Sequence, residues 1–186
     1  MTRFYTGKGD DGYTGLLGEG RIPKYHPITE AVGALDEATA ALGMARSICH
    51  APDIPDLITT VQRDLYGLMA EVSSTPDNAA RFRVIDAGRV AWLEDRTDNF
   101  SKTIHIPKEF VLPGDSQGGA AFSLARTIVR RAERRVAELL HTGAIENKEL
   151  LKYLNRLSSL CFVLELVENH SSGKSQPTLA RNNHRD

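Results

Sequence analysis

Residues 122–140 read FSLARTIVRRAERRVAELL, and the apolar positions in this stretch recur every three or four residues. That spacing puts them on one face of an α-helix, because a helix turns by about 100° per residue. We predict a helix from 118 to 142 that ends at Gly143, since glycine is common just after a helix end. The apolar stripe comprises Phe122, Ala125, Ile128, Val129, Ala132, Val136, Leu139 and Leu140.

Five arginines and one glutamate lie within ten positions of this helix. Arg126, Arg130 and Glu133 fall within about 60° of one another, on the border of the apolar stripe, with Arg134 beside them. The other two arginines point elsewhere. Two interpretations stay open. Guanidinium groups at the edge of a core can bind a polyphosphate, or the charges form a solvated face with ion pairs such as Arg130 to Glu133.

Four further stretches show helical periodicity, and together with the arginine-rich helix they predict an all-α, five-helix bundle. The last of these helices is apolar nearly all round in its second half, which predicts a central position or burial by another subunit. A long irregular stretch with a short β-like run at 103–106 precedes the arginine-rich helix. The four expected helices cover residues 28–49, 53–72, 83–98 and 146–169.

The first 24 residues differ from the rest because six glycines fall within the first 20 positions. Such density forbids a regular helix and permits a tight loop with exposed backbone. The chain therefore divides into a glycine-rich N-terminal arm (1–24), a helical bundle (25–170) and a polar tail (171–186) that we expect to be disordered.

The arm is a candidate phosphate-binding loop. Backbone N–H groups, the hydroxyl of Thr6 or Thr14 and the Lys8 ammonium suit a nucleotide phosphate. Asp10 or Asp11 is close enough in sequence to approach Mg²⁺ or a hydroxyl. The alternative is a flexible N-terminus, which is the usual state of glycine-rich chain ends, and the arm alone favours that alternative. Lys24 adds a second cation where the arm ends.

Composition excludes several classes of protein. The 186 residues have a formal net charge of −1, which argues against nucleic acid as the main partner. No stretch approaches the roughly 20 apolar residues of a membrane span. Cys49 and Cys161 match no disulfide or metal spacing, and the start of the chain has no signal-like apolar run, so we expect a reduced, cytoplasmic protein without a structural metal site.

Two further segments have open interpretations. Asn155 and Arg156 interrupt an otherwise apolar helix, so the Asn155 amide needs partners, either across to another helix or on an adenine or ribose. Phe110 precedes a Pro-Gly turn. It either packs under the loop or forms the wall of a site for a flat hydrophobic ligand.

Taken together, these segments resemble the PduO-type ATP:cob(I)alamin adenosyltransferases, collinearly from about Tyr5 to Asn169. No single element is decisive, but six in order are highly specific. The matching elements are Tyr5-Thr-x-x-Gly-Asp-x-Gly-x-Thr, the basic-Ile-Pro-Lys24 exit, Glu30-Ala-x-Gly-x-x-Asp36-Glu37, Phe110-x-Leu-Pro-Gly, Ala125-Arg-Thr-x-x-Arg-Arg-Ala-Glu-Arg134 and Tyr153-Leu-Asn-Arg-Leu-Ser.

The resemblance implies a five-helix bundle that assembles as a homotrimer, with active sites between subunits. It implies that cobalt(I) of a corrinoid attacks the 5′-carbon of ATP and releases triphosphate, with Mg²⁺ carried by ATP. A cobalamin reductase and an adenosylcobalamin-dependent enzyme are the implied protein partners. Because cobalt(I) is a strong nucleophile, such an enzyme needs alignment and charge stabilisation rather than an activating base.

The resemblance also implies roles for individual residues. Arg126 would pair with Asp36 across the subunit boundary, and Phe110 would occupy the lower axial face of the corrinoid. Together with Arg130, these are the residues on which we expect catalysis to depend. ATP would be held from the arm by Thr6, Gly7, Lys8, Gly9, Thr14 and Lys24, and from the bundle by Arg130, Arg131, Glu133, Arg134 and Asn155.

Some positions depart from the family pattern. Where this chain has Gly7, the family commonly has a basic residue, and where it has Asp115, the family has a second glycine. The family often has Asp at the position of Ser159 and Arg at the position of Leu166. None of these touches the main arginines. Two competing hypotheses remain: a non-catalytic carrier or sensor that binds ATP or adenosylcobalamin, supported only by Ser159 and Leu166, and a helical scaffold with an incidental charge stripe.

Overall fold

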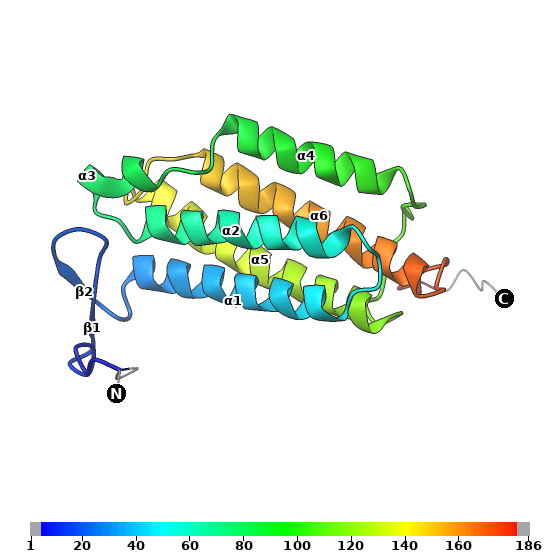
Figure 1. Ribbon diagram of the computed structural model, residues 1–186, viewed down its shortest axis with the longest axis horizontal. Helices are drawn as coiled ribbons and strands as arrows, with labels where there is room; N and C mark the ends of the chain where they lie inside the picture. Colours follow the sequence, from blue (N-terminus) through cyan, green and yellow to red (C-terminus); the bar gives the residue numbers. More distant parts are fainter. Residues whose placement is uncertain (1–4, 182–186) are drawn as a thin grey trace.

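Five long helices pack side by side, and a small hairpin lies at the end of the bundle where the first helix begins (Figure 1). The computed structural model describes residues 5–181. The long helices are α1 (Pro27–Ile48), α2 (Ile54–Val72), α4 (Ala87–Ser101), α5 (Gln117–His141) and α6 (Glu149–Ser171). The prediction of an all-α, five-helix bundle with a glycine-rich arm is confirmed.

The arginine-rich helix α5 packs most extensively against α1 and α6, whereas α2 packs on α1 and α4 packs on α6. The predicted stripe of α5 is the reason, because Phe122, Val129 and Val136 are fully buried. Helix α6 is buried almost all round from Leu160 to Asn169, which confirms its central position. None of the helices that the structure describes combines the length and hydropathy that a membrane crossing requires.

Helix α4 begins later than the expected residue 83. Its first turn starts after Asp86, whose carboxylate accepts a hydrogen bond from the Arg89 amide at 2.7 Å and caps the helix. The preceding break contains a short helix, α3 (Pro76–Ala79), and a 3₁₀ turn (Ala80–Phe82), neither of which was expected. The β-like run at 103–106 forms no strand; these fully described residues lie in a turn and an irregular segment.

The arm folds as a hairpin of β1 (Tyr13–Gly15) and β2 (Arg21–Pro23), with Thr14 opposite Ile22. Its tip is tied to the end of α2, because the Leu17 amide donates to the Ser73 carbonyl at 2.9 Å. The interpretation of the arm as a flexible terminus therefore does not describe residues 13–24.

The tail also differs from the expectation of disorder. Leu179 forms an antiparallel bridge with Val111, and the neighbouring amides and carbonyls complete a short ladder. Polar composition alone gave no sign of this pairing, because the partner strand lies far away in the sequence. Residues 182–186 lie outside the described part of the chain.

The start of α5 crosses α6 at very close range. A Cβ atom on Gly118 would lie 2.5 Å from Cγ of Glu168, and one on Gly119 would overlap the side chain of Asn169. Glu168 cannot move away easily, because its fully buried carboxylate accepts hydrogen bonds from the amides of His50 and Ala51 at 2.9–3.3 Å. This crossing therefore links α5, α6 and the α1–α2 connection.

We expect Gly119→Ala to lower the free energy of unfolding by about 1–3 kcal/mol, the usual penalty for overpacking a rigid contact. Thermal or urea denaturation followed by circular dichroism measures this. Gly33→Ala is the matched control: its added Cβ meets nothing within 4 Å on α1, so its stability should stay level or rise by up to about 1 kcal/mol. Equal stability of the two variants would contradict the close crossing.

Burial raises the pKa of the Glu165 carboxyl above its ordinary 4.5, and the Ser123 hydrogen bond and Arg126 charge offset this only in part. The folded state therefore holds this proton more tightly than the unfolded state, and stability falls as pH rises from about 4.5 through the folded pKa. We expect Glu165→Gln to melt at a higher temperature than the parent at pH 7, and the difference to vanish below pH 4.5. A gap independent of pH would contradict this.

Candidate active site

The arginines of α5 separate into two groups according to their partners. Arg131 forms an ion pair with Glu37 of α1. The guanidinium nitrogens of Arg135 lie 3.3 Å from Oε2 of Glu138 and 3.7 Å from Oε2 of Glu30. These two arginines, which helical geometry places off the shared stripe, are the ones that face the carboxylates of α1.

Arg130 and Arg134 are exposed, and neither has a carboxylate partner within residues 5–181. The expected alternative, a solvated face with a pair between Arg130 and Glu133, is not what forms. The Glu133 carboxylate instead accepts a hydrogen bond from Asn155 of α6 at 2.8 Å. Two guanidinium groups on adjacent turns of α5 are thus left to attract an anion.

Asn155 is the centre of a polar chain between three helices. Besides donating to Glu133, its carbonyl oxygen accepts from Arg156 at 2.8 Å, and Arg156 donates to Glu94 of α4 at 2.7 Å. The interhelical hydrogen bond considered for Asn155 does form. Asn155 and Glu133 are both half-buried, and Glu133 is adjacent to Arg134 in the chain, so the network joins α6 to the arginine-bearing side of α5.

Tyr153 of the same motif has a structural role. It is fully buried, and its hydroxyl donates to Asp64 of α2 at 2.6 Å. Arg89 of α4 completes the group by donating to the same carboxylate at 2.8 Å and stacking 3.8 Å from the Trp92 ring centre. Burial and the Asp64 charge hold the pKa of Tyr153 well above its ordinary value, so the phenol stays protonated.

The arm is held in shape by Arg21, which the sequence pattern marks only as the basic residue before Ile22 and Pro23 at the end of the arm. Its guanidinium donates to both oxygens of Asp11 at 2.8 Å and to the Lys8 carbonyl at 2.7 Å. This pairing lowers the pKa of Asp11. Asp11 is therefore engaged, and of the two carboxylates considered for Mg²⁺ only Asp10 has no ion partner within residues 5–181.

Glycine geometry explains one departure from the family pattern. Gly7 has a φ of +69°, in the left-handed region that favours glycine. A basic side chain at this position would be strained in this conformation, and Lys8 follows directly with its side chain exposed. Lys24 lies against the arm: its Nζ atom would be 3.0 Å from a Cβ atom on Gly9. Lys8 thus belongs to the turn before β1, and Lys24, which follows β2, packs against Gly9 of that turn.

Lys24 and Arg131 meet in a cleft of about 280 Å³ between the end of the arm, α1 and α5. Thr29 and Arg135 also line it, and the Thr29 hydroxyl is buried without a hydrogen-bond partner among the described residues. Pockets for whole drug-sized ligands usually measure about 300–1,000 Å³. The cleft is therefore smaller than a pocket for a whole nucleotide, and Glu30 and Glu37, which also line it, offset part of its positive charge.

Asp36 and Arg126 do not pair within one chain. Because α1 and α5 are antiparallel and Glu37 faces Arg131, Asp36 and Arg126 are offset by about 9 Å along the axis, at about 1.5 Å per residue. Asp36 is exposed, while Nε of Arg126 is buried and has no hydrogen-bond partner in the described chain. Asp36 thus has no ion pair among the described residues, and Arg126, although its charge acts on the buried Glu165, keeps one donor without a hydrogen bond.

Phe110 has 70% of its surface exposed, so it does not pack under its loop. It precedes α5, whereas the arm lies at the opposite end of the bundle, beside the start of α1 (Figure 1). Between residue 117 and Arg134 alone, α5 rises by about 25 Å. A single chain therefore does not bring Phe110 and the arm together.

The other departures lie apart from the arginines. Ser159 is exposed and lines a small cavity with Arg156 and Glu94. Leu166 is buried on α6.

Cys161 is also buried, which raises its pKa to about 12 and makes the thiol unreactive. No group of three or more His, Cys, Asp or Glu within the described residues is arranged to hold a metal ion.

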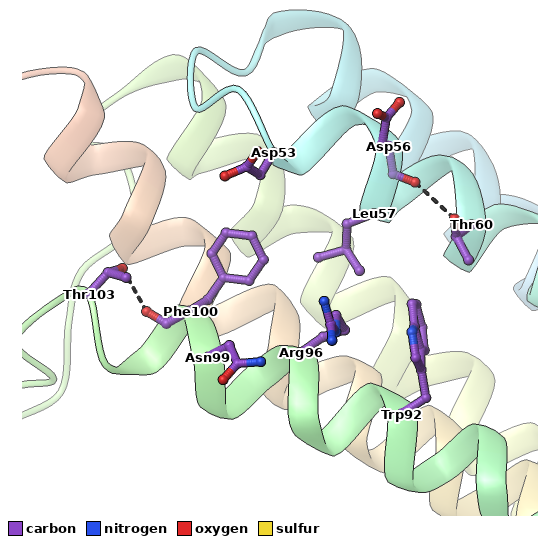
Figure 2. Close-up of a pocket in the computed structure, with 9 residues that line it drawn as sticks. All are labelled: Asp53, Asp56, Leu57, Thr60, Trp92, Arg96, Asn99, Phe100 and Thr103. Carbon is purple, nitrogen blue, oxygen red and sulfur yellow. Dashed lines mark hydrogen bonds between the residues drawn. The ribbon is translucent and has the colours of Figure 1, made fainter.

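A cavity of about 510 Å³ lies between α2 and α4 and contains none of the predicted site residues. Figure 2 shows Leu57 and Asp56 of α2 across from Trp92, Arg96 and Phe100 of α4. It arises because α4 packs on α6 rather than on α2. Its size does not make it the site, since the unpartnered arginines and the arm are elsewhere.

Comparison with known proteins gives a consistent result. The family model described as cobalamin adenosyltransferase matches residues 4–168. The corrinoid adenosyltransferase PduO of Citrobacter freundii is 35% identical over 90% of this chain, which spans only 50% of that relative. The corrinoid adenosyltransferase of Bacillus subtilis is 36% identical, over 92% of this chain and 89% of its own length.

Among solved structures, a variant of the PduO-type ATP:corrinoid adenosyltransferase from Lactobacillus reuteri, complexed with cobalamin and ATP, superposes with a TM-score of 0.88. It shares 29% sequence identity, and the match covers 97% of this chain and all of that one. The family match over most of the chain, the relatives above 30% identity and the shared fold agree: this chain belongs to the cobalamin adenosyltransferase family.

Proposed function

We propose that this protein is an ATP:corrinoid adenosyltransferase that transfers the 5′-deoxyadenosyl group of ATP to cobalt(I) of a corrinoid and releases triphosphate. The observation that supports this best is the pair of exposed arginines, Arg130 and Arg134, without carboxylate partners in the described chain. Membership of the family supplies the reaction class. The chain spans about half the length of the PduO relatives that it matches, so the activity is proposed for this part of the molecule.

In this reaction the cobalt–carbon bond forms as the bond between the 5′-carbon and its oxygen breaks, and the electron pair leaves with triphosphate. The protein must hold the 5′-carbon in line and stabilise the charge that grows on the leaving group. We assign that stabilisation to Arg130 and Arg134, with Lys8 and Lys24 from the arm and Arg131 from the cleft. Glu133 and Asn155, which are hydrogen-bonded to each other between α5 and α6, would contact the nucleotide from below.

The remaining arm residues would contribute backbone and hydroxyl groups. The Thr6 hydroxyl already accepts the Lys8 amide at 3.4 Å, which shows the turn that presents Gly7 and Gly9. Thr14 is half-buried on β1.

Mg²⁺ would arrive with ATP, since Mg²⁺ is usually held by phosphates and one or two carboxylates. Asp10 is the carboxylate in the arm that fits this role.

We propose a homotrimer with its sites between subunits. Among the described residues, Asp36 has no ion pair and the buried Nε of Arg126 has no hydrogen bond, and a neighbouring subunit would bring them together. The same arrangement would place Phe110 of one subunit near the arm of another. A ring at the lower axial face would exclude ligands from cobalt and make its reduction easier.

The reduction needs an external electron donor, so we propose a cobalamin reductase as one partner and an adenosylcobalamin-dependent enzyme as the acceptor of the product. Cys49 and Cys161 are free thiols, and we propose the reducing cytoplasm as the location. The arm (1–24) would act as a unit of the nucleotide site, and the bundle (25–170) as the body of the enzyme.

The decisive experiment is an anaerobic assay with ATP and chemically reduced corrinoid. Adenosylcobalamin and triphosphate should form in equal amounts. Binding of ATP by isothermal titration without product would favour the carrier or sensor instead. If ATP leaves the melting temperature unchanged, the scaffold interpretation holds, because ligand at about 100 times its Kd should add about 2.7 kcal/mol.

We expect Arg130→Ala to reduce turnover by at least about 100-fold, the usual effect of losing one group that stabilises transition-state charge. Its circular dichroism spectrum and melting temperature should match the parent, because Arg130 is exposed. Arg96→Ala is the matched control, since it removes an arginine from the larger α2–α4 cavity. An active Arg130→Ala, or an inactive Arg96→Ala, would contradict the assignment.

We expect Arg21→Ala to raise the KM for ATP about fivefold and leave the KM for corrinoid unchanged, because Arg21 shapes the arm through an exposed pair of modest strength. Asp11→Asn should have a similar effect, and the double variant should be no worse than either single variant. Steady-state kinetics with each substrate varied in turn measures this. Additive effects would show that the two residues act separately.

A further inference from the structure

A strap from the C-terminal segment lies along the loop that presents Phe110. The Ala180 amide donates to the Phe110 carbonyl, and the Leu112 amide donates to the Thr178 carbonyl, both at 2.8 Å. Leu179 and Val111 form the antiparallel bridge between these bonds. In Figure 1 the α4–α5 connection and the end of α6 lie together at the right-hand end of the bundle.

Asp115 latches this strap with both carboxylate oxygens. One oxygen accepts the Thr178 amide at 2.9 Å and the other accepts the Thr178 hydroxyl at 2.6 Å. Bonds from two donors to one charged group are stronger than neutral hydrogen bonds. A glycine at position 115 would have no side chain to make them, so the departure noted at Asp115 has a structural purpose in this chain.

The ladder decides which way the loop's side chains face. Side chains alternate between the two faces of an extended segment. Val111 is buried, with 8% of its surface exposed, whereas its neighbours Phe110 and Leu112 are 70% and 43% exposed. Val111 thus anchors the segment and Phe110 is turned outward.

Little else in the loop restrains Phe110. The 15 described residues between Ser101 and Gln117 contain no helix and no strand. Holding one residue's backbone in a single conformation costs about 1–2 kcal/mol of conformational entropy. The strap offsets that loss through a backbone bond made directly to Phe110.

We propose that segment 178–180, latched by Asp115 to Thr178, is a positioning element that fixes Phe110 for the corrinoid. This rests on the proposed function, in which the ring of Phe110 keeps the lower axial face of cobalt free of ligands. A ring on an unlatched loop excludes those ligands for only part of the time. Loss of the strap therefore weakens corrinoid activation and leaves the ATP half of the site intact.

The test compares Thr178→Val, which removes the hydroxyl donor, with Thr178→Ser, which keeps it. A truncation after Pro177 removes the strap, and a truncation after Arg181 keeps it. Thr103→Val is the matched control, because its hydroxyl bonds only to the Phe100 carbonyl, next to the α2–α4 cavity. The substitution variants keep the full chain, and all variants, including the two truncations, are assayed with ATP and chemically reduced cobalamin.

We expect the KM for corrinoid to rise about tenfold in Thr178→Val and further in the truncation after Pro177, in keeping with the loss of a hydrogen bond to a charged group. The KM for ATP and the melting temperature should stay at parent values. The fraction of four-coordinate cob(II)alamin, measured by its absorption and electron paramagnetic resonance in the presence of ATP, should fall in parallel. Thr178→Ser and Thr103→Val should behave as the parent.

Hydrogen exchange at the amides of Leu112 and Ala180 tests the strap without any turnover. It should accelerate in Thr178→Val and not in Thr178→Ser. An inactive parent with protected amides would reject the proposed function and keep the strap. An active parent whose strap variants keep the corrinoid KM and four-coordinate fraction would overturn the positioning role, as would an equal loss of both substrates with a lower melting temperature.

Discussion

Helix α5 has to bury one apolar stripe against two helices at once, and this constraint decides where its arginines end up. Contact with α1 and α6 uses the face that contains Phe122, Val129 and Val136. The arginines are left on the two borders of that face. On the α1 border, Glu30 and Glu37 neutralise them. On the α6 border, the acidic group Glu133 is engaged by Asn155, and Arg130 and Arg134 stay exposed.

This asymmetry distinguishes a binding helix from an ordinary charged one. A solvated face would distribute its carboxylates among its cations, because exposed ion pairs form wherever side chains meet. Here the carboxylate nearest to Arg130 and Arg134 is held by an amide, so their positive charge is not cancelled locally. The arm adds Lys8 and Lys24 on a hairpin shaped by Arg21 and tied to α2 through Leu17. Within one chain, Lys24 shares its cleft with Arg131 on the α1 border, and Arg130 and Arg134 lie on the α6 border.

Much of this was predictable from local pattern. The apolar period located all five long helices, and the breaks around them, because period and caps are encoded within a few residues. The start of α4 was misplaced because the cap of Asp86 outweighs the apolar Val84 before it. The rotation of about 100° per residue in a helix separates Arg131 from Arg130. The pairing of Arg131 with Glu37 could not be predicted in this way, because it depends on the register between α1 and α5.

Features that pair residues far apart in sequence were beyond the pattern. The hydrogen bonds that Arg21 donates to Asp11 and that the Thr178 hydroxyl donates to Asp115 are made by polar side chains with no periodicity to reveal them. The tail had the composition of a disordered segment, yet its ladder with residues 110–112 needs only two backbone bonds and one side-chain latch. Composition predicts whether a segment can form its own core, and not whether it can complete the edge of another segment.

The two halves of the proposed site lie at opposite ends of the bundle. The arm and Arg134 lie toward one end, and Phe110 with its strap lies at the other, separated by about 25 Å or more along α5. Transfer of an adenosyl group requires the reacting atoms to approach within roughly 3–3.5 Å. Each half of the proposed site is therefore too distant from the other half of its own chain. This separation is the reason for proposing that a neighbouring copy supplies the missing half, and the exposed Asp36 and the Nε of Arg126, which has no hydrogen-bond partner among the described residues, are consistent with that proposal.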